Sequence, residues 1–437
     1  MGLARSGSAV ARALARRGAD VAGCDSAHPQ EAEGLTGTGV EVSLDADGVD
    51  LLRRARCVVK SPGVPQDAAV VEGARERGMP VIGELEVAWR MIPNRFIAVT
   101  GTNGKSTVTE LIGHVHGQAA LPAAVAGNVG TPLASLAGEV EPEATVICEC
   151  SSFQLEDADA FAPECGAFLN FAPDHLDRHR SLEDYLEAKL RLFAKQGNDD
   201  VAVYNAEEPA LRGRDLGGCA RRVPFCRHRG GDPDCAVALE GETIFWGDEQ
   251  LIEVGELSLL GPHNADNAMA AAAASLSMGV GTEAVRDGLR GFGGIPHRLE
   301  RVTEIGAVTF VNDSKATNVA AAAAGVRSFE GGVRAILGGS LKGEGFADLA
   351  APVWERCVAC YLIGEAAERL ERDLQPARER GVELHSEGGL EDAVRAAADA
   401  ARPGEVVLLA PACASFDAYR DFEARGEHFR AIAESLR

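Results

Sequence analysis

One stretch constrains the fold of this chain more than any other: a short apolar run, a glycine-rich turn and an amphipathic helix follow one another directly. Residues 96–100 (Phe-Ile-Ala-Val-Thr) predict a buried strand. The apolar positions between 108 and 115 have the spacing of one helix face. The turn between them, residues 101–107, ends in Lys-Ser-Thr. The stretch therefore predicts a strand, a tight turn and a helix of an α/β domain.

This turn has the chemistry of a phosphate site. Glycines let successive backbone N–H groups point into one concavity, and the start of a helix adds a partial positive charge. A polyphosphate would fit there, with Lys105 at the outer phosphates and the Ser106 hydroxyl on Mg²⁺. The strict template has glycine where this chain has Val99. The alternative is an ordinary turn with a chance Gly-Lys-Ser, but the flanking strand and helix favour ATP or GTP binding.

Length and charge limit the remaining possibilities. The 437 residues predict two or three domains, and the formal net charge of −23 argues against nucleic acid or anionic membranes as partners. No apolar run approaches the roughly 20 residues of a membrane span, and no leader is visible, so we expect a cytoplasmic protein. The 11 cysteines are scattered, which predicts reduced, buried thiols. Cys357 and Cys360 form one lone pair, which favours a place in the core over a zinc site.

The N-terminal region resembles a dinucleotide-binding opening without its first strand. Residues 2–7 predict a turn, residues 8–17 a helix, and residues 21–25 a strand that ends in an acid. The glycine spacing gives poor support for a nicotinamide site. We expect a weakened or rearranged N-terminal sheet, and residues 83–95 as the first domain boundary.

The middle of the chain alternates strands and helices, which predicts a mostly parallel sheet with ligands beyond the carboxyl ends of its strands. Glu149 ends the predicted strand 145–150, and His175 follows the predicted strand 167–171. A buried carboxylate needs a partner, and nucleotide-bound Mg²⁺ is a natural one for Glu149. Pairing of Glu149 with a structural arginine is the alternative.

Lys189 lies on the apolar stripe of a helix predicted over 181–194. Periodicity alone favours a lysine whose ammonium extends to solvent. The alternative is a partly desolvated, neutral amine, which beside a metal site can add CO2 to form a carbamate ligand. Further along, Asn264 and Asn267 share one helix face, where both amides can bind one ligand or serve simply as helix caps. Cys226 and Cys235 fit no standard metal spacing.

Beyond residues 291–298, the second predicted boundary, further strand-to-helix units predict a third α/β domain. At this point several motifs together carry a family resemblance, and they are Gly101-Thr102-Asn103-Gly104-Lys105-Ser106-Thr107, Gly127-Asn128-Val129-Gly130, Glu149-Cys150-Ser151-Ser152-Phe153-Gln154-Leu155, Asp174-His175-Leu176-Asp177, Lys189 in Glu187-Ala188-Lys189, His263-Asn264 with Asn267, His297-Arg298, Asn312-Asp313-Ser314-Lys315-Ala316-Thr317-Asn318, and Ser415-Phe416-Asp417 with Phe422. Over nearly its whole length the chain resembles a Mur ligase, and within that family the D-glutamate-adding type.

The resemblance implies an α/β fold of three domains: residues 1–93, Rossmann-like and lacking the first strand, for the UDP substrate; residues 94–297, a P-loop ATPase-like parallel sheet; and residues 298–437, Rossmann-like, for the amino acid. It implies ATP-dependent ligation through an acyl phosphate, with UDP-N-acetylmuramoyl-L-alanine, D-glutamate and ATP as substrates, Mg²⁺, a carbamylated Lys189, and a monomeric enzyme of cell-wall precursor synthesis.

The resemblance also assigns residues to these ligands by position. The catalytic set is Lys105, Glu149, His175 and Lys189, and the metal set is Ser106, Glu149, His175 and Lys189. The ATP set is Gly101, Thr102, Asn103, Gly104, Lys105, Ser106, Thr107, Asn264, Asn267, Arg298 and Asp313. The substrate set is Ser6, Gly63, Asn128 and Ser151, with Thr317, Lys342, Ser415 and Phe422 for D-glutamate.

The sequence differs from the family pattern in two ways, and three alternative functions compete with this interpretation. The first strand is absent, and Ala27 lies where the D-glutamate type often has arginine, which puts the first-domain ligand contacts in question. The alternatives are a Mur-type ligase for another amino acid, a P-loop small-molecule kinase, and a nucleotide-sensing protein without catalysis. Glu149 and Lys189 count against the sensor, which needs no metal cluster.

Overall fold

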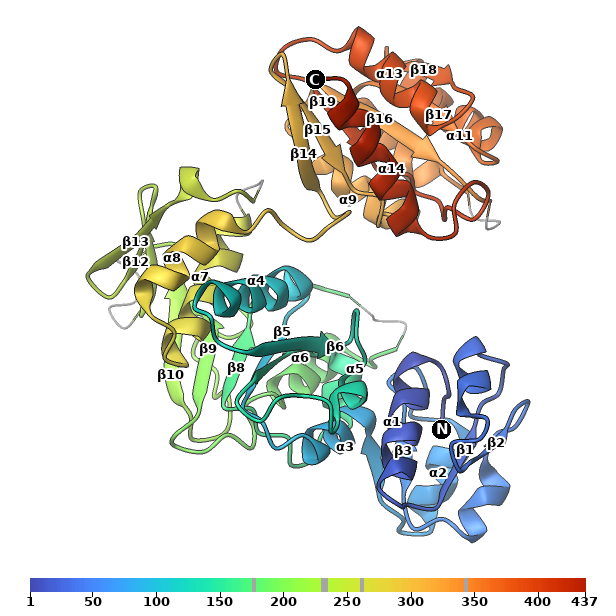
Figure 1. Ribbon diagram of the computed structural model, residues 1–437, viewed down its shortest axis with the longest axis vertical. Coiled ribbons are helices and arrows are strands. Elements are labelled where there is room, and N and C mark those ends of the chain that lie inside the picture. Colours follow the sequence, from blue (N-terminus) through green and yellow to red (C-terminus); the bar gives the residue numbers. More distant parts are fainter. Residues whose placement is uncertain (175–177, 229–234, 260–262, 342–344) are drawn as a thin grey trace. The chain divides into compact units, whose positions relative to one another are not determined.

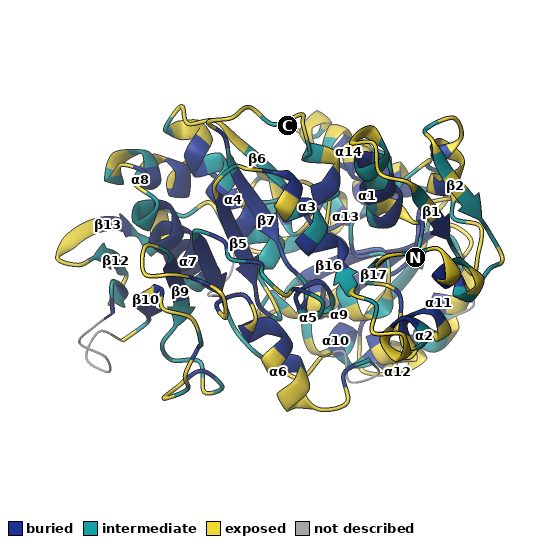
Figure 2. Cartoon of the chain, turned by 90° about the horizontal axis from the view of Figure 1, so that it is seen from below, coloured by how far each residue is buried: buried dark blue, intermediate teal, exposed yellow. Residues whose placement is uncertain are grey.

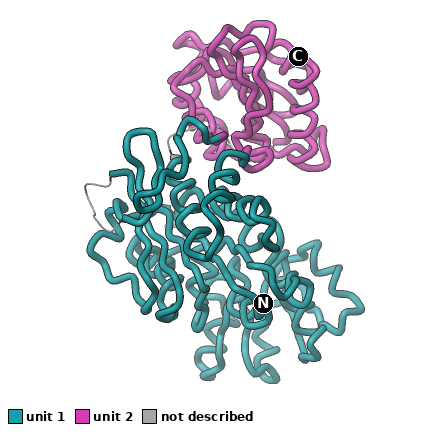
Figure 3. The backbone as a smooth tube through the Cα atoms, turned by 60° about the vertical axis from the view of Figure 1, so that its left-hand side comes forward, with its two compact units in different colours: residues 1–257, 263–292 teal, residues 258–262, 293–437 magenta. Residues whose placement is uncertain are grey.

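The computed structural model describes residues 1–174, 178–228, 235–259, 263–341 and 345–437. The chain forms two compact units, drawn in different colours in Figure 3. Unit 1 comprises residues 1–257 and 263–292, and unit 2 comprises residues 258–262 and 293–437. The two units meet in the chain between Phe292 and Gly293.

Unit 1 contains a nine-stranded sheet in the order β13-β12-β11-β10-β9-β8-β5-β7-β6 (Figure 1). Its strands are β5 (Phe96–Thr100), β6 (Ala123–Gly127), β7 (Thr145–Glu149), β8 (Cys165–Phe168), β9 (Val201–Asn205), β10 (Arg221–Cys226), β11 (Val237–Glu240), β12 (Thr243–Trp246) and β13 (Glu249–Glu253). Strands β5 to β11 run parallel, and β12 and β13 add an antiparallel extension. The predicted parallel sheet is therefore confirmed.

Helices cover both faces of this sheet, which explains why β5 is apolar without alternation. They are α3 (Glu84–Met91), α4 (Lys105–Gln118), α5 (Ser152–Glu156), α6 (Leu182–Leu190), α7 (His263–Ser277) and α8 (Thr282–Gly291). Phe96 and Ala98 pack in one core with side chains of α3, α5 and α6, and α4 and α7 contact strands of the sheet. All five residues of β5 are buried, as the dark blue strands of Figure 2 illustrate.

The N-terminal sheet is rearranged, as expected. It consists of two separate parallel pairs, β1 (Val21–Cys24) with β2 (Val40–Ser43) and β3 (Val58–Lys60) with β4 (Val81–Gly83). Met1 and Gly2 bridge the pairs: the Met1 ammonium donates to Val59 O at 2.9 Å, and Gly2 N donates to Cys24 O at 2.9 Å. Met1 and Gly2 thus make hydrogen bonds to both strand pairs, as a strand between them would.

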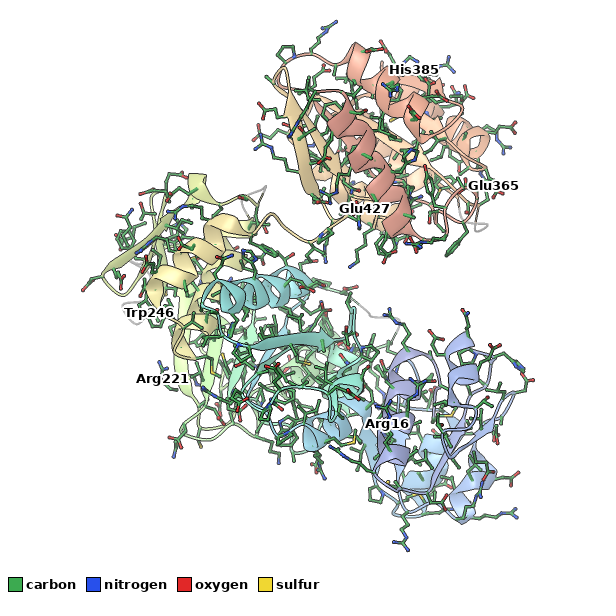
Figure 4. All side chains as sticks on the ribbon, viewed as in Figure 1. Arg16, Arg221, Trp246, Glu365, His385 and Glu427 are labelled. Atoms are coloured by element: carbon green, nitrogen blue, oxygen red, sulfur yellow. A yellow bond between two sulfur atoms is a disulfide. The ribbon has the colours of Figure 1, made fainter. Side chains whose placement is uncertain are left out.

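Two helices complete this region, α1 (Arg5–Arg16) and α2 (Ala69–Glu76). Helix α1 begins earlier than the predicted residue 8, so Ser6 and Gly7 lie in its first turn. The region is tied to the large sheet by the fully buried Lys60, whose ammonium lies 2.6 Å from Asp157 Oδ2 after α5. On the surface, Arg16 (labelled in Figure 4) pairs with Glu139 at 3.1 Å.

Unit 2 is a second α/β sheet, in the order β14-β15-β19-β16-β17-β18. Its strands are β14 (Glu300–Ile305), β15 (Val308–Asn312), β16 (Val333–Gly338), β17 (Cys357–Ile363), β18 (Glu383–Ser386) and β19 (Val406–Leu409), and its helices are α9 (Val319–Arg327), α10 (Ala350–Arg356), α11 (Ala367–Asp373), α12 (Gln375–Arg378), α13 (Leu390–Ala400) and α14 (Phe422–Ser435). Only β14 is antiparallel to its neighbour in this described sheet. Buried clusters lie on both faces, which confirms the predicted Rossmann-like third part.

The cysteines differ in part from the prediction of reduced, buried thiols. Cys226 and Cys235 form a disulfide across a nine-residue separation, and Cys57 and Cys219 are exposed. The pairing was not foreseen because sequence spacing does not show that the end of β10 and the residues before β11 meet. Cys357 and Cys360 are buried in the core of unit 2, as predicted. None of the helices within the described residues has the length and apolar character of a bilayer span.

Candidate active site

The glycine-rich turn leaves β5 and enters α4 as predicted, and its shape requires glycine at one point. Gly104 is the N-cap of α4 with φ +82°, a left-handed conformation that glycine adopts without strain. A Cβ there would lie 2.3 Å from Asn267 Oδ1 of α7. The turn therefore passes close to α7, and the first backbone N–H groups of α4 have no acceptor within the helix.

A second segment clamps this turn. The Asn170 side chain accepts from Asn103 N at 2.8 Å and donates to Asn103 O at 3.1 Å, and Thr102 N donates to Asn170 O at 3.0 Å. Thr102 and Ala172 exchange two further hydrogen bonds through the threonine hydroxyl. The chain after β8 thus fixes the turn residue by residue, so that the turn is preorganised for a ligand.

Two lysines converge on one carbonyl of the turn. Lys105 Nζ donates to Gly101 O at 3.0 Å and to Thr102 O at 2.9 Å, and Lys189 Nζ of α6 donates to Gly101 O at 2.7 Å. Burial, followed by repulsion from Lys105, lowers the pKa of Lys189 to about 7. An amine with that pKa is neutral in a large fraction of molecules near pH 7.

The position of Lys189 corrects the interpretation that periodicity favoured. The side chain is 1% exposed and its Nζ lies 4.6 Å from the centroid of the Tyr185 ring, so its ammonium does not extend to solvent. The cause is tertiary: Ser181 caps α6 by accepting from Asp184 N at 3.1 Å, and the helix then directs Lys189 at the carbonyl end of β5.

A carboxylate and a hydroxyl face each other at the start of α4. Ser106 Oγ donates to Glu149 Oε2 at 2.6 Å, and Asn128 Nδ2 donates to Glu149 Oε1 at 3.3 Å. Glu149 is 3% exposed and ends β7, which is hydrogen-bonded to β5 and to β6, the strand before Asn128. The parallel sheet therefore brings three predicted residues together at one edge, and Glu149 pairs with a serine and an amide rather than with a structural arginine.

The two asparagines of α7 are linked to each other. Asn267 Nδ2 donates to Asn264 Oδ1 at 2.8 Å, and both side chains are buried. Between them, Asp266 accepts two hydrogen bonds from Arg227 at 2.7 and 2.8 Å. Arg227, which follows β10, thus binds the helix that carries the amide pair next to Gly104.

The four residues predicted for the UDP substrate lie on four segments, and Asn128 follows β6. Ser6 is in the first turn of α1, the exposed Gly63 is in the turn after β3, and Ser151 caps α5 in a reciprocal capping box with Gln154. Arg5 of α1 donates to Gly130 O at 2.8 Å, so the loop that contains Asn128 contacts the start of α1.

In unit 2, Asp313 and its neighbours form a second group of predicted residues. Asp313 follows β15, is 6% exposed and accepts from Leu299 N at 3.1 Å, next to the exposed Arg298. Burial raises the pKa of Asp313 to about 6. His297 and Leu299 have φ of +62° and +45°, a left-handed conformation that is strained for residues other than glycine.

The remaining predicted residues of unit 2 gather where β15 and β19 end. Arg425 of α14 donates to Ser314 O at 2.9 Å, Cys413 O at 3.1 Å and Ala414 O at 3.2 Å, which holds the loop before the buried Ser415. Ser314 Oγ donates to Phe422 O at 2.8 Å. Thr317, Ser415 and Phe422 are therefore presented at one edge of the sheet. On α14, Glu427 (labelled in Figure 4) lies 3.5 Å from His297 Nε2.

Comparisons with known proteins agree with this arrangement. Residues 1–83 match the model of the Mur ligase MurD-like N-terminal domain, residues 99–275 that of the Mur ligase middle domain, and residues 297–413 that of the Mur ligase glutamate ligase domain. The chain belongs to the Mur ligase family. Three Mur ligase domains thus occur in the order that the sequence predicted.

Curated Mur ligases are similar over the whole chain. A UDP-N-acetylmuramoylalanine–D-glutamate ligase of Acidobacterium capsulatum is 40% identical, covering 99% of this chain and 95% of the relative. One of Pelotomaculum thermopropionicum is 39% identical, covering 100% and 97%. Among solved structures, MurC of Thermotoga maritima aligns with a TM-score of 0.59 at 18% identity, covering 100% of this chain and 98% of that one, which shows a shared fold.

The structure brings together only part of the predicted Mur ligase site. In unit 1, Lys105, Ser106, Asn128, Glu149 and Lys189 surround the turn, with Asn264 and Asn267 beside it. Arg298, Asp313, Thr317, Ser415 and Phe422 belong to unit 2, where they form their own groups. His175 and Lys342 lie outside the described residues. Within the described part of the chain, no group of three His, Cys, Asp or Glu side chains has the geometry of a metal site.

Sequence reasoning missed several supporting residues. Asn170 clamps the glycine-rich turn, Arg227 binds Asp266 of α7, and Arg425 binds the loops after β15 and β19 in unit 2. A polar residue within the otherwise apolar predicted strand 167–171 was a usable signal for Asn170, which lies two positions after the end of β8. No sequence signal marks Arg425, because its partners, three backbone carbonyls and the Ser314 hydroxyl, are all more than ten residues away.

The buried amine of Lys189 makes a testable contribution to stability. Between about pH 7 and 10 it is neutral in the folded protein but protonated in the unfolded chain, so the unfolded chain binds more protons and stability rises with pH. We expect the free energy of unfolding to rise with a slope approaching about 1.4 kcal/mol per pH unit. This slope should be lost in Lys189→Met. The control variant Lys195→Met, at an exposed lysine, should keep it. Urea unfolding in CO2-free buffer at pH 7.5 and 9.5 measures it. Equal pH dependence in wild type and Lys189→Met would contradict the assignment.

Proposed function

We propose that this chain is an ATP-dependent ligase that joins the carboxyl group of UDP-N-acetylmuramoyl-L-alanine to the amine of D-glutamate, in peptidoglycan precursor synthesis. The observation that carries the proposal is the convergence of Lys105, Ser106, Glu149 and Lys189 on one preorganised turn. The full-length similarity to ligases of that name supports the choice of substrates.

The chemistry requires activation of a carboxylate, which is a poor acyl donor at neutral pH. A carboxylate oxygen attacks the γ-phosphorus of ATP, the bond to the β-phosphate oxygen breaks, and ADP leaves with the bonding electrons. The amine of D-glutamate then adds to the acyl carbon of the acyl phosphate, loses a proton to a base, and expels inorganic phosphate. Phosphoryl transfer of this kind depends on positioning and on neutralising oxygen charge.

The residues of the turn supply those two functions. Lys105 lies at the first turn of α4, where its ammonium would leave the Gly101 and Thr102 carbonyls for the outer phosphates of ATP. The N–H groups of the turn and of the start of α4 would bind phosphate oxygens. Asn264 and Asn267, beside Gly104, would orient the rest of the nucleotide. Arg298 and Asp313 would contact ATP from unit 2, and Thr317, Lys342, Ser415 and Phe422 would bind D-glutamate.

The oxygen donors at this edge fit Mg²⁺. The Ser106 hydroxyl and the buried Glu149 carboxylate lie 2.6 Å apart, and oxygen ligands of this kind are what Mg²⁺ prefers. Ser106 and Glu149 would hold the ion, together with His175 and a carbamate on Lys189. Bound Mg²⁺ supplies positive charge that stabilises the transferring phosphoryl group.

The carbamate proposal rests on the state of Lys189. A neutral, buried amine adds CO2 through a new N–C bond and releases one proton, which converts the neutral amine into a carbamate anion that suits a divalent metal. The lowered pKa of Lys189 and its place 2.7 Å from Gly101 O support this step. Ser6, Gly63, Asn128 and Ser151 would contact the UDP substrate, and the enzyme would act as a cytoplasmic monomer.

The proposed reaction predicts phosphate release that depends on both co-substrates. Purified enzyme with ATP, Mg²⁺ and UDP-N-acetylmuramoyl-L-alanine is expected to release phosphate at a sustained rate only after D-glutamate is added. L-glutamate and L-alanine are the matched controls and should give a small fraction of that rate. Full turnover without any amino acid would identify a kinase, and preference for another amino acid would identify a different Mur-type ligase.

If Lys189 carries a carbamate, Lys189→Ala is expected to lose activity by about 10³-fold or more. The substitution removes both the charged metal ligand and the buried side chain that bears it. Short carboxylic acids such as acetate should restore part of the rate, since they can occupy the place of the carbamate. The exposed Lys195 provides a control, Lys195→Ala, which should be active and unaffected by acetate. Full activity of Lys189→Ala without additives would rule out the carbamate.

A further inference from the structure

The turn after β3 is held by an arginine that the function so far described does not use. Arg178 donates through Nη2 to Pro62 O at 2.8 Å and to Val64 O at 2.6 Å, and through Nη1 to Gly63 O at 3.2 Å. One guanidinium thus binds three consecutive carbonyls. A planar group with several fixed donors can do this, whereas a lysine ammonium cannot match the same geometry.

The arginine is itself held in place from the other side. Its Cζ lies 4.8 Å from the centroid of the Phe153 ring on α5. The next residue, His179, stacks on the same ring with centroids 5.2 Å apart and lies with Nε2 3.0 Å from Ser152 Oγ. His179 is 5% exposed, so this anchor is buried. The guanidinium is therefore presented to the turn by packed neighbours on the large sheet.

These bonds fix the direction of one peptide N–H. In a trans peptide the C=O and the following N–H point in opposite directions. Because Pro62 O faces Arg178, the N–H of Gly63 points away from the arginine. Gly63 is exposed, and a Cβ there would meet no atom within 4 Å. Within the described residues no acceptor takes this N–H, whereas Val64 N donates to Ser61 O at 3.0 Å.

A separate contact stabilises the junction between the turn after β3 and the large sheet. The fully buried Lys60 pairs with Asp157 at 2.6 Å and also donates to Val64 O at 2.9 Å. Arg178 is partly exposed, so its removal leaves this buried pair intact. The arginine is consequently expected to affect the shape of the turn more than the stability of the fold.

We propose that Arg178 is a positioning residue for the sugar-nucleotide substrate. It holds the turn 61–64 so that the Gly63 N–H is aimed outward as a donor for an anionic group, of which a nucleoside diphosphate sugar carries two in its diphosphate. The inference rests on the proposed function, since it takes that substrate as the ligand of Gly63.

The test compares Arg178→Gln and Arg178→Lys with Arg180→Gln, a variant of an exposed arginine two residues away. Isothermal titration with UDP-N-acetylmuramoyl-L-alanine, without ATP, is expected to show affinity weakened 10- to 100-fold for Arg178→Gln and less for Arg178→Lys. In the full assay the KM for this substrate should rise by the same factor, while the KM for ATP and for D-glutamate and the kcat stay within about threefold. Arg180→Gln should match the wild type.

Added guanidinium at low millimolar concentration should partly restore the affinity of Arg178→Ala, which a purely structural defect would not permit. Unchanged affinity in Arg178→Gln, or an equal loss for all three substrates, would overturn the inference while leaving the proposed function in place. If Arg178→Gln does not fold, Arg178→Lys is used instead. A selective loss of affinity for this substrate supports the inference, and unchanged affinity or an equal loss for all three substrates overturns it. A wild-type enzyme that neither binds nor turns over this substrate would instead overturn the proposed function.

Discussion

The carbonyl oxygen of Gly101 is the backbone atom around which the candidate site is arranged. It accepts from both Lys105 and Lys189, which places two ammonium groups at the end of one buried strand. Burial of the Lys189 side chain, followed by repulsion from Lys105, lowers the pKa of Lys189. In the proposed function, Lys105 is the cation for phosphate and Lys189 the neutral amine that adds CO2. Two lysines that donate to one carbonyl would thus have different roles.

The parallel sheet explains why the other groups meet at this carbonyl. Strands β6, β7, β5 and β8 are adjacent, and each is followed by a segment with a polar function: Asn128 after β6, Glu149 at the end of β7, the glycine-rich turn after β5 and Asn170 after β8. Carboxyl ends of parallel strands share one edge, so residues up to 70 positions apart become neighbours. The fold therefore preorganises the site before any ligand binds.

Much of this was predictable from the sequence because it is local. The strand and helix that flank the turn and the alternating units of both sheets follow from periodicity and turn chemistry. The burial of Lys189 was not predictable from periodicity, since the stripe that contains it fits a lysine extending to solvent equally well. The clamp by Asn170, the disulfide of Cys226 and Cys235, and the three carbonyls bound by Arg178 all depend on contacts between distant segments, which composition and spacing do not encode.

The central claim is that this site activates a carboxyl group by phosphoryl transfer before the amide forms. The most direct test uses UDP-N-acetylmuramoyl-L-alanine labelled with ¹⁸O in its terminal carboxyl group, with ATP and D-glutamate. We expect one labelled oxygen per turnover to appear in inorganic phosphate, detected by mass spectrometry or by the ³¹P isotope shift. Phosphate without the label, formed at the same rate as the amide, would contradict it.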